Sequence, residues 1–316
     1  MGYLLHILVN ISIYGILAVS FDLVLGYAGL FSVAHAAFFG MGAYVAALAT
    51  LHLGTPFLLN VLLAAAFCAV AGALLAIPAI RVGGDYLVIA SFGFMSLVFT
   101  VMLNWTEVTR GALGLRSIAQ PSIFGWEVRT LPRYALLYLV IAGLLIAAAR
   151  RLAGSPFGRA LKAIRENQLA AEAAGKNPVY FKTWVFALAG AMAGVAGTMY
   201  AHYVTFVGPY AFTMDVSVLL FAMVILGCAG TIVGPLMGAV LLVILPEALR
   251  FLMVPPRLQG PVRQMVYGLL LVVFMLARPD GLYGMLGDLR ALLRRRAATG
   301  GPPREHGSLG GGERVA

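Results

Sequence analysis

The sequence predicts an all-α protein, a polytopic transmembrane helical bundle of about eight or nine spans. The 316 residues are 61% hydrophobic and only 11% charged, whereas about a quarter of the residues are charged in soluble proteins. Several apolar segments reach the roughly 20 residues that a helix needs to cross a bilayer about 30 Å thick. No segment shows the alternation of apolar and polar residues that is typical of transmembrane β-barrels.

Four spans are predicted in the N-terminal half. The N-terminus lacks a positively charged segment and a small-residue cleavage site, so we expect the first helix to be retained. Residues 26–35 are rich in glycine and polar side chains, and such a break at membrane depth is tolerated where it lines a cavity or is buried in protein. The predicted spans cover residues 4–25, 36–51, 56–80 and 86–103.

Five spans are predicted in the C-terminal half, after an ordered external loop at 104–133. The count falls to eight if the short seventh span or the break near Gly29 is re-entrant. Residues 1–289 would form the transmembrane domain, and residues 290–316 a basic tail whose Gly, Pro and Arg content is typical of disorder. The spans cover residues 134–149, 181–206, 212–228, 233–251 and 262–277.

Basic residues are concentrated in two segments. Residues 150–182 carry seven Lys or Arg against two Glu, so this interval supplies half of the formal net charge of +10. Residues 278–316 carry seven further arginines. Because Lys and Arg mark cytoplasmic loops, nine spans place the N-terminus outside and the C-terminus in the cytoplasm. These flanking positions indicate contact with the lipid bilayer and no nucleic acid partner.

Catalytic and cofactor-binding motifs are absent from the sequence. It contains no phosphate-binding G-x-x-x-x-G-K-[ST] loop, no His pair at metal-ligand spacing and no G-x-S-x-G elbow. Cys68 and Cys228 both lie in apolar surroundings, which excludes a disulfide framework. We therefore expect no enzyme activity, and no metal or cofactor bound by this chain.

The basic interval carries the signals of one short amphipathic helix. Ser155 with Pro156 is a start signal, and Gly175 before Asn177 and Pro178 is a stop signal. The alternative is a solvated loop that obeys only the positive-inside rule. Apolar residues recur between the two ends at spacings of three and four, at Phe157, Ala160, Leu161, Ile164 and Ala171.

Two short segments repeat each other. The sequence LGYAG at residues 25–29 matches LGCAG at residues 226–230. Either the chain contains two related half-units, as many transporters do, or the match is chance in a chain rich in Gly and Ala.

Four motifs in a fixed order resemble one known family. They are GYAGLFSVAHAAFFGMGAY, SPFGRALKAIRENQLAAEAAGKNPVYFK, LGCAGTIVGPLMGA and RPDGL. Together they resemble the permease subunits of branched-chain amino acid ABC importers, of the LivM type, over residues 4–284. The resemblance implies translocation of branched-chain, hydrophobic amino acids across a prokaryotic plasma (inner) membrane. Urea or short amides are the alternative substrates within the family.

The resemblance also implies partner subunits. A second related permease would complete the pathway, and two ATP-binding-cassette ATPase subunits would bind ATP and Mg. An extracytoplasmic substrate-binding protein would deliver the substrate. The missing phosphate-binding loop agrees with a nucleotide site on another chain. Pairing with a different permease or with a second copy stays open.

In this family the cytoplasmic segment couples the permease to the ATPase, and the resemblance assigns that role to residues 159–175. An amphipathic helix offers an apolar ridge to a groove, and its charges fix the register. Residues 172–175 are similar to the EAA signature of importer permeases but lack the usual spacer before the glycine. The implied coupling residues are Arg159, Leu161, Lys162, Ile164, Arg165, Glu166, Glu172, Ala173, Ala174 and Gly175.

Candidate residues of the translocation pathway lie in and beside the glycine-rich break. An intramembrane carboxyl group such as that of Asp22 indicates a functional site, for a substrate ammonium group or a proton relay; a solvated or capping Asp is the alternative. Tyr27, Ser32 and His35 would either face the pathway or pack between helices.

Glycines at G-x-x-x-G spacing predict close helix packing. Gly230, Gly234 and Gly238 form one series, and Gly190 with Gly194 forms another. These contacts would lie within the subunit or with a paired permease.

Two other classes of transport protein remain as alternatives. A secondary transporter would need a midplane ion site, for which Asp22 is the candidate. An ion channel would need a filter of carbonyl groups or rings of charge, which no repeated segment offers. Arg110 stands where the relatives commonly have glycine, which leaves the role of the external loop open.

Overall fold

The described part of the chain is an all-helical bundle with four two-residue strands. This computed structural model describes residues 2–82, 84–123, 126–127, 130–250 and 259–277. The predicted tail at 290–316 lies outside them. The long helices are α1 (Gly2–Asp22), α2 (His35–Leu53), α3 (Phe57–Val82), α4 (Gly84–Asn104), α6 (Leu131–Gly154), α9 (Pro178–Val204), α10 (Met214–Gly227), α11 (Val233–Arg250) and α12 (Gln259–Ala277). The shorter elements are the π-helical turn η1 (Leu23–Tyr27), α5 (Thr106–Thr109), the 3-10 turns η2 (Gly111–Leu113) and η3 (Pro209–Phe212), α7 (Pro156–Glu166), α8 (Gln168–Ala173) and the strands β1 (Leu115–Arg116), β2 (Ser122–Ile123), β3 (Trp126–Glu127) and β4 (Phe206–Val207).

Every predicted span contains a helix. Within the described residues, seven helices are long and apolar enough to cross a membrane. The last two predicted spans hold shorter apolar helices, Val233–Pro246 and Gln264–Val273. The predicted all-α, polytopic bundle is therefore confirmed.

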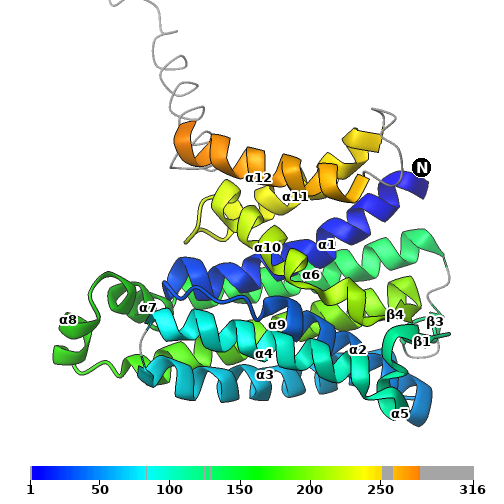
Figure 1. The fold of residues 1–316 in the computed structure, drawn as a ribbon, viewed down its shortest axis with the longest axis horizontal. Helices are drawn as coiled ribbons and strands as arrows, with labels where there is room; N and C mark the ends of the chain where they lie inside the picture. The colour runs from blue at the N-terminus through cyan, green and yellow to red at the C-terminus, as the bar shows by residue number, and fades with distance from the viewer. Residues whose placement is uncertain (1, 83, 124–125, 128–129, 251–258, 278–316) are drawn as a thin grey trace, which may run out of the picture.

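Helix α9 lies at the centre of the bundle and packs closely on α2 and α3 (Figure 1). Glycines allow the close approach, because a methyl group at Gly194 would lie 2.7 Å from the Ala64 carbonyl oxygen of α3. Gly190 similarly faces the Cys68 backbone. Most side chains of α1 and α9 are buried, whereas most of those on α3, α4 and α6 are at least partly exposed, as expected for helices that face lipid.

The second glycine series joins α10 to α11. Gly234 packs against the Gly227 backbone, and Gly238 packs against the Met223 carbonyl. Gly230 lies before α11, in the turn that follows α10, with φ +83°. The contacts of both glycine series therefore lie within this subunit.

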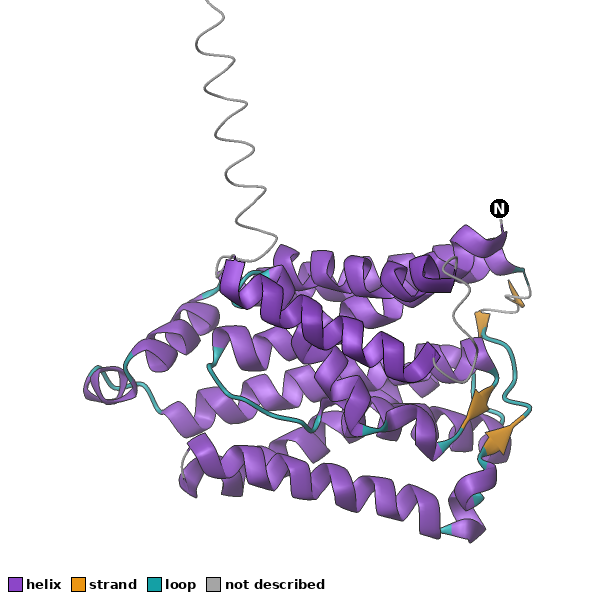
Figure 2. Ribbon diagram, turned by 45° about the horizontal axis from the view of Figure 1, so that its top comes forward, coloured by secondary structure: helices purple, strands orange, loops and turns teal. Residues whose placement is uncertain are grey.

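The two ends of the bundle carry different structures. Helices α7 and α8 project at one end, and the strands lie at the other end near the N-terminus (Figures 1 and 2). The predicted loop at 104–133 is held by antiparallel pairing of β1 with β4, in which Leu115 lies opposite Val207. His202 Nδ1 also lies 2.8 Å from the Ala119 carbonyl oxygen. The N-terminus and the basic interval thus lie at opposite ends, as the predicted orientation requires.

Candidate functional site

The first transmembrane helix ends in a wide turn, and the candidate site begins there. Helix α1 passes into the π-helical turn η1, and the Leu30 N–H donates to the Val24 carbonyl at 3.0 Å. Gly29 has φ +68°, a left-handed conformation that favours glycine. The chain then runs without helical structure until α2 begins at His35. The predicted break between the first two spans is therefore present, and we call residues 28–34 the break segment.

Two buried serines satisfy the backbone of the break segment. The Ser91 hydroxyl on α4 accepts from the Val33 N–H at 3.0 Å. The Ser217 hydroxyl on α10 donates to the Val33 carbonyl at 2.6 Å and accepts from the Ala36 N–H at 3.2 Å. Backbone polar groups at membrane depth need such partners because lipid offers none. The serines therefore hold an irregular segment between two helices.

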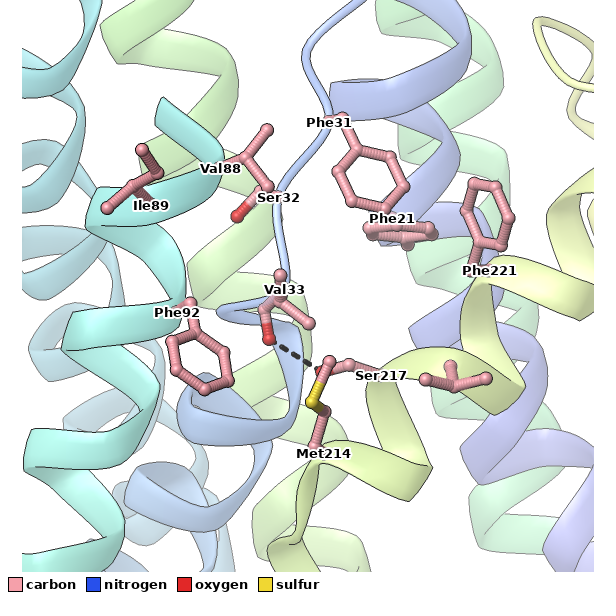
Figure 3. Close-up of a pocket in the computed structure, with 11 residues that line it drawn as sticks. Phe21, Phe31, Ser32, Val33, Val88, Ile89, Phe92, Met214, Ser217 and Phe221 are labelled. Atoms are coloured by element: carbon pink, nitrogen blue, oxygen red, sulfur yellow. Dashed lines mark hydrogen bonds between the residues drawn. The ribbon is translucent and has the colours of Figure 1, made fainter. Parts of the chain in front are cut away.

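A cavity of about 340 Å³ lies beside the break segment, between α1, α4 and α10 (Figure 3). Its wall is almost wholly apolar, and Phe31 packs edge-to-face on Phe221 with ring centroids 5.1 Å apart. Ser32 and Ser217 supply the hydroxyl groups of the wall. The lining residues are Phe21, Phe31, Ser32, Val33, Val88, Ile89, Phe92, Met214, Ser217, Val218 and Phe221.

Behind the cavity wall lies His35. The imidazole is fully buried, and its edge packs on Phe21, with ring centroids 4.8 Å apart. Neither ring nitrogen has a hydrogen-bond partner of standard geometry among the described residues, although the Ser20 backbone interacts with the ring. The ring therefore supports Phe21 and does not itself line the cavity.

A polar cluster lies on the other side of the break. Asp22 is fully buried, and its Oδ1 accepts from the Gly230 N–H at 2.7 Å. Its Oδ2 has no hydrogen-bond partner among the described residues. The Arg165 guanidinium on α7 donates to the Gly26 carbonyl. We call Asp22, Gly26, Arg165 and Gly230 the break–turn cluster.

A second cation of α7 reaches the same turn. Lys162 Nζ lies 4.8 Å from the centre of the Tyr27 ring, within the range of a cation–π interaction. The charges of both Lys162 and Arg165 act on the Asp22 carboxyl group. Helix α7 is therefore attached to the end of α1 by two positively charged side chains.

The single helix predicted between Ser155 and Gly175 is wrong, because the segment forms two helices. The predicted start is present, with the Ser155 hydroxyl accepting from the Gly158 N–H at 3.4 Å. Asn167 ends α7 in an extended conformation, and its side chain caps α8 by accepting from the Ala170 N–H at 3.0 Å. An Asn side chain can cap a new helix in this way, so the chain turns where one continuous helix was expected.

Comparison with known proteins assigns the family. Residues 3–275 match the model of the family described as branched-chain amino acid transport system / permease component. The chain is 33% identical over 296 residues to the high-affinity branched-chain amino acid transport system permease protein LivM of Salmonella typhimurium, and equally to LivM of Escherichia coli, covering 86% of this chain and 68% of each relative. It is 26% identical over 300 residues to the permease protein LivH of Escherichia coli, covering 86% of this chain and 92% of that protein.

The chain belongs to this permease family. No solved structure gave a significant match. Membership in the permease family and the apolar helices make the chain a multi-pass integral membrane protein.

The predicted pathway residues of this permease are divided between the two sides of the break. Ser32 lines the cavity, whereas Asp22 and Tyr27 lie with α7 at the polar cluster, and His35 lies behind Phe21. Asp22 is not solvated, because its exposed fraction is 0%.

The predicted coupling residues also fall into two sets. Leu161 and Ile164 are buried, and Lys162 and Arg165 reach the break. Lys162 and Arg165 are themselves exposed. The remaining residues are also exposed and lie on the outer side of α7 and on α8 and its end. They are Arg159, Glu166, Glu172, Ala173, Ala174 and Gly175.

Sequence reasoning missed three residues that matter at the site. Ser91 and Ser217 each hold the break segment, and the available signal was an isolated hydroxyl in an apolar span. Leu169 on α8 is 78% exposed. The sequence signal for Leu169 was an apolar side chain outside the buried apolar stripe of the basic interval.

Proposed function

We propose that this chain is the permease subunit of an ATP-binding-cassette importer that moves branched-chain, hydrophobic amino acids across a prokaryotic plasma membrane. Separate ATPase subunits would bind and hydrolyse ATP. One observation carries the proposal: the apolar cavity and helix α7 lie on the two sides of the same helix break. The names of LivM and LivH, which are branched-chain amino acid transport permeases, support the substrate class.

The cavity supports an aliphatic substrate. Its volume of about 340 Å³ lies within the range of small-molecule sites, about 300–1,000 Å³. Transfer of an aliphatic side chain to such a wall contributes about 0.8 kcal/mol for each buried CH₂ group. Leucine would therefore be favoured over alanine. Urea and short amides are less well suited, because they need hydrogen-bonding groups that this wall largely lacks.

The face around the break supports pairing with a second permease. Gly29 and Phe31 of the break segment are exposed, and so are Ile89 and Val218 on the flanking helices. Irregular backbone does not face lipid within the hydrocarbon region. A second related permease, with an aqueous pathway between the two subunits, would cover this face. An extracytoplasmic binding protein would deliver the substrate at the strand end.

The exposed side of α7 and α8 supports docking on the ATPase subunits. Leu169 projects from α8 with 78% of its surface exposed, among polar and small side chains. A single apolar side chain on a projecting helix suits a groove on a partner protein. With α7 and α8 facing the ATPase subunits, these helices are cytoplasmic and the N-terminus is outside. We further expect that genes for two ATPases, a second permease and a binding protein flank the gene of this chain.

The substrate part of the proposal can be tested by narrowing the cavity. The variant V218F places an aromatic ring in the wall, whereas V140F makes the same exchange on α6, outside the cavity; both valines are exposed. We expect V218F to raise KM for leucine about tenfold, because overpacking costs about 1–3 kcal/mol. Uptake would be measured in vesicles that contain the assembled transporter. Equal KM values for V218F and V140F would contradict this assignment of the cavity.

A further inference from the structure

The break–turn cluster joins three segments that are far apart in the sequence. Arg165 of α7 donates to the Gly26 carbonyl in η1. Asp22 at the end of α1 accepts from the Gly230 N–H in the turn between α10 and α11. The end of α1, the α10–α11 turn and α7 therefore meet at one point.

The packing of the cluster leaves little free space. A methyl group at Gly26 would overlap both the Asp22 carboxyl group and the Gly230 nitrogen. At Gly29 it would lie 2.7 Å from Arg165 Cγ, and at Gly230 it would lie 3.3 Å from Arg165 Nη1. Arg165 thus packs against the last glycine of each of the two repeated segments, LGYAG and LGCAG.

The bonds of this cluster suit the transmission of movement. A hydrogen bond with one charged partner is roughly twice as strong as a neutral one, and Gly26, Gly29 and Gly230 let the segments approach closely. The two segments joined to Arg165 border the cavity through the break segment and α10. A displacement of α7 would therefore move both of these walls of the cavity together.

We propose that Arg165 and Asp22 are positioning residues that fasten α7 to the helix break and to the α10–α11 turn, so that movement of α7 during the ATP cycle moves both walls of the cavity. The proposal rests on the proposed function, because it requires ATPase subunits that move α7. Arg165 then acts on the permease side of the coupling segment, and the partner contacts the outer side.

The test uses the assembled transporter with its partner subunits, reconstituted in vesicles, with leucine as the probe. The variant R165A removes the bond to Gly26, and R165K keeps the charge. The matched control is R150A, because Arg150 lies on α6, outside the coupling segment at 159–175, and is exposed. Two further variants are D22N, which keeps an acceptor for the Gly230 N–H, and D22A, which removes it.

Three quantities separate coupling from docking and folding. They are association of the ATPase subunits, ATP hydrolysis, and leucine imported per ATP hydrolysed. For R165A we expect association of the ATPase subunits and ATP hydrolysis to persist. The leucine imported per ATP hydrolysed should fall about tenfold, the order expected from loss of one hydrogen bond to a charged group. R165K should recover part of the leucine imported per ATP, D22N should retain more of it than D22A, and R150A should match the wild type.

A native thiol reports the movement directly. Cys228 is half-buried two residues before Gly230, whereas Cys68 is fully buried. We expect ATP with vanadate to change the rate at which N-ethylmaleimide labels Cys228 in the wild type, with C228S as the unlabelled control. The change should be lost in R165A and kept in R150A.

Two results would overturn the proposal in different ways. An R165A variant with the same leucine imported per ATP and the same ATP-dependent labelling as R150A would overturn the role of Arg165 and leave the proposed function standing. Absence of ATP-dependent leucine uptake by the wild-type assembly would overturn the proposed function and this proposal with it.

Discussion

Removal of the Ser217 hydroxyl should loosen the break segment. This hydroxyl donates to the Val33 carbonyl at 2.6 Å and accepts from the Ala36 N–H at 3.2 Å, and the side chain is 2% exposed. In S217A both backbone groups lose this partner. Each of the two unsatisfied buried groups costs about 1–3 kcal/mol, so we expect a loss of about 2–6 kcal/mol of unfolding free energy.

The loss can be measured as a shift of the thermal unfolding midpoint in detergent. A change of 1 kcal/mol corresponds to about 2–4 °C in chains of 150–250 residues. A larger chain lies at the lower end of that range, so the unfolding midpoint of S217A should lie about 4–12 °C below that of the wild type. The control is S12A, because among the described residues the Ser12 hydroxyl bonds only to the Leu8 carbonyl within its own helix. Equal thermal unfolding midpoints for S217A and S12A would refute the reasoning.

Three further predictions test other parts of the structure. G194A should destabilise the bundle by about 1–3 kcal/mol, because its methyl group would lie 2.7 Å from the Ala64 carbonyl, whereas G143A meets nothing within 4 Å; equal thermal midpoints would contradict the α3–α9 packing. R110G should have a thermal midpoint at or above that of the wild type, whereas R110V should lose about 1–2 kcal/mol of unfolding free energy. Arg110 has φ +58°, and this conformation disfavours β-branched residues most. The reverse order of stability would be inconsistent with this backbone. L169E should reduce co-purification of the ATPase subunits about tenfold without changing the thermal midpoint, because Leu169 is 78% exposed and buried apolar anchors dominate interfaces; unchanged co-purification would place the docking surface elsewhere.

Local sequence signals predicted much of the fold. Long apolar runs mark all nine helices at the predicted spans, because a bilayer sets both the length and the polarity of a span. The break at residues 26–35 followed from its glycines, and Gly29 does adopt a left-handed conformation. The start of α7 at Ser155 and Pro156 followed from the chemistry of helix caps.

Long-range contacts could not be predicted in the same way. Arg165 meets Gly26 across 139 residues, and Asp22 meets Gly230 across 208, and nothing local specifies such partners. The sequence showed that LGYAG and LGCAG are alike but not that Arg165 packs against the glycine that ends each of them. The turn at Asn167 was missed because a strong apolar periodicity continued through it, although Asn is itself a good helix cap.

The central claim is that this permease imports branched-chain amino acids at the expense of ATP hydrolysed by partner subunits. The most direct measurement is accumulation of labelled leucine in vesicles that contain the assembled transporter and its binding protein, with ATP supplied or withheld on the ATPase side. We predict accumulation against a gradient only with ATP and only when the ATPase subunits are present. Accumulation that continues without ATP or without those subunits would contradict the claim and favour a secondary transporter.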